Sequence, residues 1–300
     1  MGLFSRRKII VTHDGRFHAD EVFAIALLKM IPEFKNTKLI RSRDQKIIEK
    51  ADIVLDVGGV YDPLKYRFDH HQTGGAGKHE NGIPYSSFGL IWKEFGIKVC
   101  ESDEVLKGVT EKLVQQIDAM DCGFSITTPI ISGVSEFVLD DMADAFNPSW
   151  KEDECNRDEA FREVLGIASR ILEREIKKAK DKAEAGHIVE KAYIEATDKR
   201  IIIFPRHYPF QDVLMKYQEP MFAIYPHTVA NTWAVRTISA EKGTFKNRKD
   251  LPKAWAGKRD LELAQISGIA DAKFCHNTLY IGTACSKEGA VKMAELALKQ

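Results

Sequence analysis

The sequence predicts an α/β protein of two domains: a parallel-sheet domain over residues 1–186, followed by a smaller α+β domain over residues 187–300. The chain has 300 residues, 44% of them hydrophobic and 29% charged, so it is long enough for two cores and has an ordinary globular composition. Unbroken β-branched runs alternate with helical stretches in the first half, which is typical of a parallel sheet. Short strand-like runs between Pro, Gly and charged turns fill the second half.

The first domain begins with alternating strands and helices. Residues 8–12 (KIIVT) predict a strand, and residues 20–31, which Pro32 ends, predict the helix that follows. Further strands are predicted at 37–41 (TKLIR) and at 51–58 (ADIVLDVG), where the continuous apolar run indicates a strand buried on both faces.

Three helical segments are predicted before the domain boundary. Residues 86–95 precede Gly96, which we expect to close a helix, and residues 103–120 carry an amphipathic stripe. The segment from Asp158 to Gly186 predicts a long charged helix, and we place the domain boundary at its end.

The second domain is expected to contain five short strands and a final helix. The strands are predicted in the runs AYIEA, RIIIFP, MFAIYP, TWAVRTI and TLYIG between residues 192 and 282, and the helix at 286–299. This pattern is typical of a small α+β domain.

Composition excludes several classes of protein. Lys+Arg and Asp+Glu both number 44, so there is little overall field to hold duplex nucleic acid, and any contact with a polyanion must be local. The longest apolar runs are too short to span a bilayer, and the basic start lacks the apolar core of a signal peptide. Five scattered cysteines without Cys-x-x-Cys spacing disfavour a disulfide frame. We therefore expect a cytoplasmic protein without membrane partners, and a homo-oligomer stays open.

Candidate metal ligands gather where the predicted strands end. His13 follows the first strand, and His18 and Asp20 lie where the next helix opens, so the three side chains can converge. Asp56 comes late in a buried strand, just before two glycines. Because open α/β sheets bind ligands at the carboxyl ends of their strands, we expect a site at this edge.

Two later segments extend this pattern. Asp69, His70 and His71 follow the apolar run YRF, and the segment DAMDCG contains Asp118 and Asp121. Any one of these side chains alone is more often a helix cap or a hydrogen-bonded structural residue, but together they favour a metal site. Imidazoles mixed with carboxylates suit manganese, iron or zinc better than calcium.

The residue types also favour a particular chemistry. A carboxylate such as Asp56 can bridge two divalent ions, and such a pair activates water and clamps the oxygens of a phosphoryl displacement. We expect His71 to contact the phosphate or donate a proton, and Asp69 to orient a neighbouring histidine. The stretch from His18 to Asp20 is also similar to the H-x-E of zinc deaminases, but the P-C-x-x-C that this chemistry requires is missing.

Four motifs closely resemble one known family. They are FHADE at 17–21, VLDVGG at 54–59, FDHHQ at 68–72 and IDAMDCG at 117–123. They resemble the melanocyte-proliferating-gene family, an outlying branch of the DHH phosphoesterases, and the resemblance covers nearly the whole chain. It implies a DHH-like catalytic domain with paired metal ions, usually manganese, and a C-terminal domain that grips the substrate.

The resemblance implies a role for each motif. Carried over residue by residue, the first motif falls on His13, His18 and Asp20, the second on Asp56, the third on Asp69, His70 and His71, and the fourth on Asp121 or Asp118. His18 replaces the usual aspartate, which disfavours magnesium; manganese is expected first, with zinc, iron or cobalt as alternatives. The expected C-terminal Gly-Gly-His is replaced by Gly282, Thr283 and Ala284.

The activity implied by the resemblance is a 3'–5' exonuclease that acts on short single-stranded RNA. Residues 241–260 hold seven Lys or Arg against three acids, with Phe245 and Trp255 interleaved, as single-stranded nucleic acid requires. A solvated loop with a buried Trp explains the same pattern equally well. Substrate contacts are expected from Arg236, Arg248, Trp255, Arg259 and His276.

Two other functions stay open. A pyrophosphatase or small (di)nucleotide phosphatase would use the same chemistry, and would be favoured if the basic stretch faced away from the metal site. A metal-binding regulatory module without turnover would be favoured if protein groups blocked the open coordination position. The choice between RNA and DNA and the polarity of cleavage also stay open.

Overall fold

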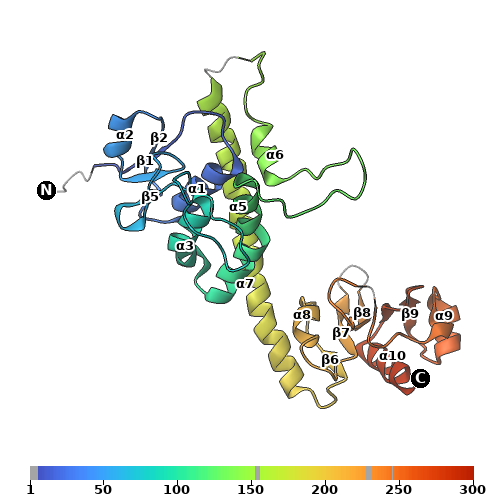
Figure 1. The fold of residues 1–300 in the computed structure, drawn as a ribbon. Coiled ribbons are helices and arrows are strands. Elements are labelled where there is room, and N and C mark those ends of the chain that lie inside the picture. The colour runs from blue at the N-terminus through green and yellow to red at the C-terminus, as the bar shows by residue number, and fades with distance from the viewer. Residues whose placement is uncertain (1–5, 153–155, 228–230, 245) are drawn as a thin grey trace. The chain divides into compact units, whose positions relative to one another are not determined.

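The computed structural model describes residues 6–152, 156–227, 231–244 and 246–300, so Phe245 lies outside the described residues (Figure 1). The chain divides into two compact units, residues 1–180 and 181–300. The division falls inside α7 (Arg157–Glu195), a helix that starts in the first unit and ends in the second.

The first unit is built on a five-stranded sheet in the order β2-β1-β3-β5-β4. Its strands are β1 (Ile9–Thr12), β2 (Lys38–Arg41), β3 (Ile53–Leu55), β4 (Tyr61–Asp62) and β5 (Arg67–Phe68). β1 runs parallel to β2 and β3, β3 runs parallel to β5, and β4 is antiparallel at the edge. The predicted α/β fold is confirmed. β3 is shorter than the predicted run because Asp56 turns the chain with a φ of 54°.

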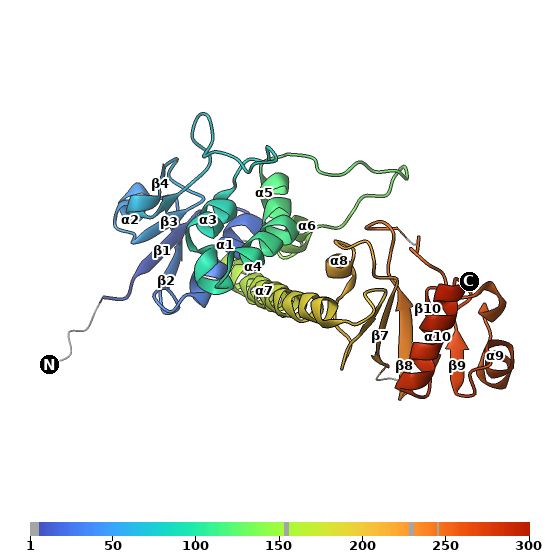
Figure 2. The same ribbon diagram turned by 90° about the horizontal axis from the view of Figure 1, so that it is seen from below.

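Helices cover both faces of this sheet (Figure 2). They are α1 (Ala19–Met30), α2 (Gln45–Glu49), α3 (Ser87–Cys100), α4 (Asp103–Val109), a π-helical turn (Thr110–Val114), α5 (Gln115–Asp121) and α6 (Leu139–Asp144). α1, α3 and α5 pack against one another, whereas Ile48 of α2 packs against Val11 and Val54 on the other face. Every residue from Ala19 to Leu28 is buried, so α1 is the central helix of this unit.

The prediction that Gly96 closes α3 is wrong. The helix continues to Cys100. A Cβ on Gly96 would lie 2.8 Å from Leu106 Cδ1 and 3.0 Å from the Trp92 ring. The glycine therefore allows Leu106 of α4 to pack closely against α3. Glu101 takes the left-handed conformation that ends the helix, with a φ of 66°.

The second unit has its own five-stranded sheet, in the order β6-β7-β8-β10-β9. The strands are β6 (Ile201–Ile203), β7 (Phe222–His227), β8 (Thr232–Thr237), β9 (Ala272–Cys275) and β10 (Ile281–Ala284). β6 runs parallel to β7, and the other neighbours are antiparallel. The helices are α8 (Gln211–Leu214), α9 (Asp260–Ser267) and α10 (Lys287–Lys299), and α10 packs against the central strands.

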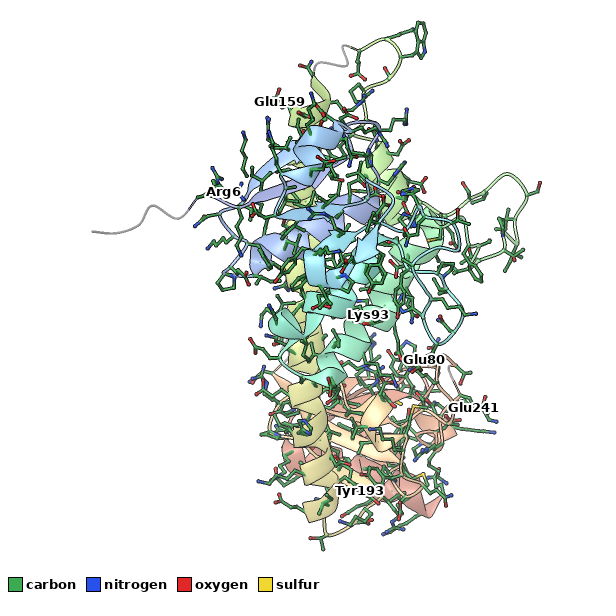
Figure 3. The ribbon with its side chains drawn as sticks, turned by 60° about the vertical axis from the view of Figure 1, so that its left-hand side comes forward. Arg6, Glu80, Lys93, Glu159, Tyr193 and Glu241 are labelled. Atoms are coloured by element: carbon green, nitrogen blue, oxygen red, sulfur yellow. The ribbon has the colours of Figure 1, made fainter. Side chains whose placement is uncertain are left out.

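The predictions of a helix end near Gly186 and of a strand at 192–196 are wrong. α7 continues through both places, to Glu195, since its apolar spacing persists beyond the glycine. Val189 and Tyr193, four residues apart, are buried in the core of the second unit with Phe204. Tyr193 is labelled near the end of α7 in Figure 3. No helix in the described part of the chain combines the length and the apolar character that a membrane crossing requires.

Candidate metal centre

The carboxyl ends of β1 and β3 bring His13 and Asp56 together. These strands are parallel neighbours, so the residues that follow them lie at one edge of the sheet. His13 Nε2 lies 3.1 Å from Asp56 Oδ2. The left-handed backbone of Asp56, which aspartate tolerates better than most residues, ends β3 at this point.

The other oxygen of Asp56 faces a second histidine. His70 Nε2 lies 3.5 Å from Asp56 Oδ1 and 3.1 Å from Asp121 Oδ2, at the end of α5. The carboxylate of Asp56 therefore lies between His13 and His70, with one oxygen toward each. A carboxylate that bridges two cations needs this arrangement.

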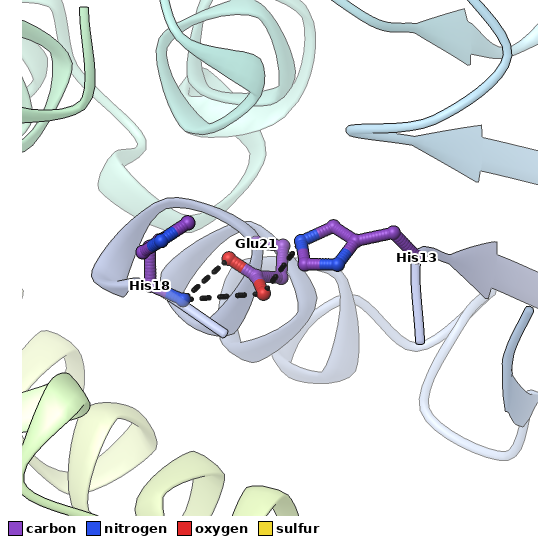
Figure 4. A group of neighbouring side chains, drawn as sticks. All are labelled: His13, His18 and Glu21. Atoms are coloured by element: carbon purple, nitrogen blue, oxygen red, sulfur yellow. Dashed lines mark hydrogen bonds and ion pairs between the residues drawn. The ribbon is translucent and has the colours of Figure 1, made fainter. Parts of the chain in front are cut away.

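Glu21 is a buried carboxylate that the sequence analysis did not select. Its Oε1 lies 3.0 Å from His13 Nε2, and both of its oxygens accept hydrogen bonds from the backbone N–H of His18 (Figure 4). Ligand atoms of His13, His18 and Glu21 all lie within 4.8 Å of one another. The sequence signal was the capping-box position, three residues after the N-cap His18, and it indicated only a helix start.

Asp20 faces the start of α3. Its fully buried carboxylate accepts hydrogen bonds at 2.5 to 3.2 Å from Ser86 Oγ and from the backbone N–H groups of Ser87 and Phe88. Burial raises the pKa of Asp20, and the negative charges of Asp121 and Asp56 raise it further. Its role as a metal ligand stays a prediction.

The two candidates for the fourth motif have different surroundings. Asp121 contacts His70 and lines the site cavity described below. Asp118 is buried with His79 Nε2 and Ser86 Oγ at 2.6 Å each, and it accepts a hydrogen bond from the backbone N–H of Gly89. Ser86 Oγ contacts both Asp118 and Asp20, so Asp118 acts on Asp20 through Ser86 and does not itself line the cavity. No motif indicated His79 or Ser86.

Asp69 holds His71 at the edge of the site. Asp69 Oδ1 lies 2.7 Å from His71 Nδ1 and accepts from the backbone N–H of His71, while Oδ2 accepts from the N–H of Gly59. The side chain of His71 is 62% exposed, and its Nδ1 lies 3.5 Å from Asp56 Oδ1. An exposed imidazole is thus fixed beside the buried cluster.

Several of these side chains line a cavity of about 720 Å³ in the first unit. Its walls include His13, His18, Asp56, Asp121 and His71. Two arginines that the sequence analysis did not select, Arg16 and Arg43, line the same cavity. The buried cluster is therefore accessible to a ligand.

The carboxylates of the cluster favour positive charge on its histidines. Burial opposes protonation of His13, but hydrogen bonds to Asp56 and Glu21 outweigh it and raise the pKa of His13 to about 9. Burial also opposes protonation of His70, but the adjacent carboxylates of Asp121 and Asp56 raise that pKa well above the ordinary value. Burial alone would raise the pKa of Asp56, but contacts with His13 and His70 hold it below its usual range. The field of these carboxylates attracts cations.

The unsatisfied atoms of the cluster fit a divalent metal. Among the described residues, Asp56 Oδ1 and His70 Nε2 are buried without a well-oriented hydrogen bond, although they lie 3.5 Å apart. Buried polar atoms normally have hydrogen-bond partners. Polar atoms that point at one place without bonding to one another have the arrangement of ligands around a metal ion. The groups with suitable spacing are His13-His18-Glu21, Asp56-His70-His71 and His70-Asp121-Cys122. Their imidazoles and carboxylates suit a transition metal.

Two predicted substrate contacts share a cavity of about 510 Å³ in the second unit. Arg236 and His276 line it together with Tyr280. The guanidinium of Arg236 lies 5.6 Å from the Tyr280 ring centre, and the His276 ring lies 4.8 Å from it. A cation, an imidazole and an aromatic ring therefore meet at one place.

The other predicted contacts are dispersed. Trp255 is 3% exposed in the core of the second unit, so the prediction of a stacking surface is wrong and the buried-Trp interpretation holds. The guanidinium of Arg248 donates to backbone carbonyls of Met215, Tyr217 and Pro220, which is a structural role. Arg259 lies over the Phe274 ring at 4.6 Å. Arg248 and Trp255 therefore serve the packing of the second unit and are not exposed binding groups.

Comparison with known proteins agrees with the motifs. The sequence model of the MYG1 exonuclease family, described as uncharacterised protein family UPF0160, matches residues 9–298. A MYG1 protein of Dictyostelium discoideum is 32% identical over 97% of this chain and 96% of the relative. A MYG1 protein of Caenorhabditis elegans is 31% identical over 97% of this chain and 95% of the relative, and the MYG1 exonuclease of Homo sapiens is 30% identical over 97% and 86%. The chain therefore belongs to the MYG1 exonuclease family, UPF0160.

Proposed function

We propose that this protein is a divalent-metal-dependent phosphodiester hydrolase of the DHH superfamily, a 3'–5' exonuclease that acts on short single-stranded RNA. The observation that carries the proposal is the carboxylate of Asp56, which gives one oxygen to His13 and the other to His70 in an accessible cavity. The names of the human and rat relatives, MYG1 exonuclease, support nucleic acid as the substrate.

The proposed cofactor is a pair of divalent ions, manganese first, with zinc, iron or cobalt as alternatives. When bound, the ions supply water activation and neutralise charge on the phosphoryl oxygens. His13, His18 and Glu21 would hold one ion, His70 and Asp121 would hold the other, and Asp56 would lie between them.

His71 is proposed as the phosphate contact or proton donor. Its ring is exposed to the cavity and is positioned through Nδ1 by the buried carboxylate of Asp69. A carboxylate behind an imidazole fixes its orientation and tautomer, so Asp69 is a positioning residue. In the second unit, Arg236, His276 and Tyr280 would hold a nucleotide by phosphate contact and stacking.

One observation favours a second candidate, a pyrophosphatase or small (di)nucleotide phosphatase. Because Trp255 is buried and Arg248 is bound to backbone carbonyls, the basic stretch offers less to a long single strand than the sequence indicated. A module without turnover is less well supported, since the cavity leaves His71 exposed.

A side-by-side assay tests the proposal. Metal-loaded protein is incubated with short RNA and short DNA, each labelled at the 5' end, and with pyrophosphate and cyclic dinucleotides. We expect a ladder of shortened RNA, because trimming from the 3' end keeps the label on the longer product. Immediate release of a labelled mononucleotide would reverse the polarity. Turnover of the small substrates alone would establish the second candidate, and no turnover of any substrate would contradict both.

Metal binding is a separate prediction. After loading with manganese and desalting, we expect about one to two ions per chain, because the clustered imidazoles and carboxylates supply two incomplete ligand shells. Elemental analysis measures the content, and His70→Ala should lower it. Less than roughly half an equivalent of manganese, iron, cobalt or zinc would contradict the proposal.

A further inference from the structure

We propose that Arg16 and Arg43 form an anion subsite in the wall of the metal cavity, and that this subsite binds a phosphate next to the one that is cleaved. The inference rests on the proposed phosphodiesterase function and deepens it, because it requires a substrate with at least two phosphates. Neither arginine was a candidate site residue in the sequence analysis, although Arg16 lies inside the first motif, between His13 and His18.

The fold brings both arginines to the carboxyl edge of the sheet. Arg43 follows β2, the parallel neighbour of β1, and Arg16 lies in the loop between β1 and α1, three residues after His13. A Cβ built on Gly15 would lie 3.6 Å from Arg43 Nη2 and 3.6 Å from His13 Nδ1. Arg43 Nη2 and His13 Nδ1 therefore both face the position that a side chain at residue 15 would take.

This position places the arginine on the side of His13 that is opposite Asp56 and Glu21. His13 Nε2 faces Asp56 and Glu21, whereas its Nδ1 lies on the side of the ring toward Gly15. Arg43 Nη2 lies beside the same glycine. A phosphate held by Arg43 would thus lie beyond the imidazole, and not among the carboxylates. We infer that the subsite serves the flanking phosphate.

Both guanidinium groups are available to a ligand. Arg16 pairs with Asp144 and Arg43 pairs with Asp14 at 3.5 Å, and all four side chains are between 48% and 63% exposed. Exposed ion pairs are weak and screened by salt, so a phosphate can displace either carboxylate.

Arg41, in the same region, provides a contrast. Its side chain is 3% exposed, its guanidinium donates to the carbonyl of Gly15 and pairs with Asp158, and it packs over the ring of Phe161. Arg41 therefore stabilises the loop that carries Arg16, through its bond to Gly15, and its guanidinium is not available to a ligand.

The charges of the cavity wall favour a second anion at the arginines. Asp56, Asp69 and Asp121 line the cavity, and the two proposed divalent ions would offset the charge of these carboxylates where the cleaved phosphate binds. Within the lining drawn from the described residues, Arg16 and Arg43 carry the permanent positive charges. The planar guanidinium group can bind two oxygens of one phosphate. A substrate with a single phosphate would leave these arginines without a ligand.

The kinetic test compares two substrates on Arg16→Gln and Arg43→Gln. For a short RNA, we expect each change to raise KM about tenfold, the scale of one lost charged hydrogen bond. For bis(p-nitrophenyl) phosphate, which has one phosphorus atom, kcat/KM should stay within about twofold. Arg170→Gln is the matched control, because Arg170 is an exposed arginine on α7 in a 3.5 Å ion pair with Glu173.

A binding titration gives a second measurement, the salt dependence of oligonucleotide binding. This dependence would not change if the arginines had only a structural role. In the Asp56→Asn background, the logarithm of oligonucleotide affinity is plotted against the logarithm of salt concentration. Each Arg→Gln change should reduce the slope by about 0.7, the value for one phosphate contact with a single strand. Arg43→Lys should retain the slope, because it keeps the charge.

Two results would overturn the subsite. One is an unchanged KM and slope in both Gln variants, and the other is an equal loss on both substrates, which would mean that the arginines only support His13. If the wild-type protein hydrolyses neither substrate, the proposed function fails instead. The salt slopes then still decide the subsite, because they depend on binding alone: lower slopes support it and unchanged slopes contradict it.

Discussion

Asp56→Asn is expected to lower phosphodiester cleavage by on the order of a hundredfold or more while the chain stays folded. Asp56 turns one oxygen toward His13 and the other toward His70, so an amide in its place cannot supply negative charge to both sides. The backbone should not change, since asparagine also tolerates the left-handed φ of 54° at this position. Initial rates on a labelled oligonucleotide after metal loading measure the loss.

The matched control is Asp103→Asn. Asp103 is an exposed aspartate in the first turn of α4, outside the ligand groups of the site, and its variant should keep near-normal rates. Thermal unfolding of both proteins shows whether the fold is intact. A folded Asp56→Asn protein with wild-type turnover would remove Asp56 from the mechanism.

Gly89→Ala and Gly108→Ala should change stability in opposite directions. A Cβ on Gly89 would lie 2.1 Å from Asp118 Oδ2, so the new methyl group must displace a buried carboxylate that is bonded to His79 and Ser86. We expect this change to lower the free energy of unfolding by about 1–3 kcal/mol or more. At Gly108, an exposed position in α4, nothing lies within 4 Å of the Cβ, and alanine should stabilise the helix by about 0.5–1 kcal/mol.

Denaturant titration of the two variants measures both free energies. Because Ser86 holds Asp118 and Asp20 together, Gly89→Ala should also reduce cleavage, whereas Gly108→Ala should leave it unchanged. Equal stability changes in the two proteins would mean that Asp118 moves aside freely and does not support the site.

The sequence by itself determined the class of the first sheet and the place of the site. A strand with continuous apolar residues is buried on both faces, and such strands are parallel neighbours whose ends meet at one edge. His13 and Asp56 follow two of these strands, so their meeting was predictable before any contact was known. The four short motifs also identified the family, because together they are highly specific.

Only the tertiary structure decided which carboxylates meet which histidines. Asp118 and Asp121 are three residues apart on one helix, so sequence spacing puts them on the same face, and only packing directs one to His79 and the other to His70.

The same limit explains the remaining differences. Gly96 and Gly186 signal helix ends locally, but the contacts of Gly96 with Leu106 and the burial of Val189 in the second core involve residues that local patterns do not relate. Arg43 and His13 lie beside the same residue, Gly15, only because β2 pairs with β1 across an intervening helix. Periodicity reports which face of an element is apolar; the neighbour that covers that face depends on long-range packing, which no local pattern contains.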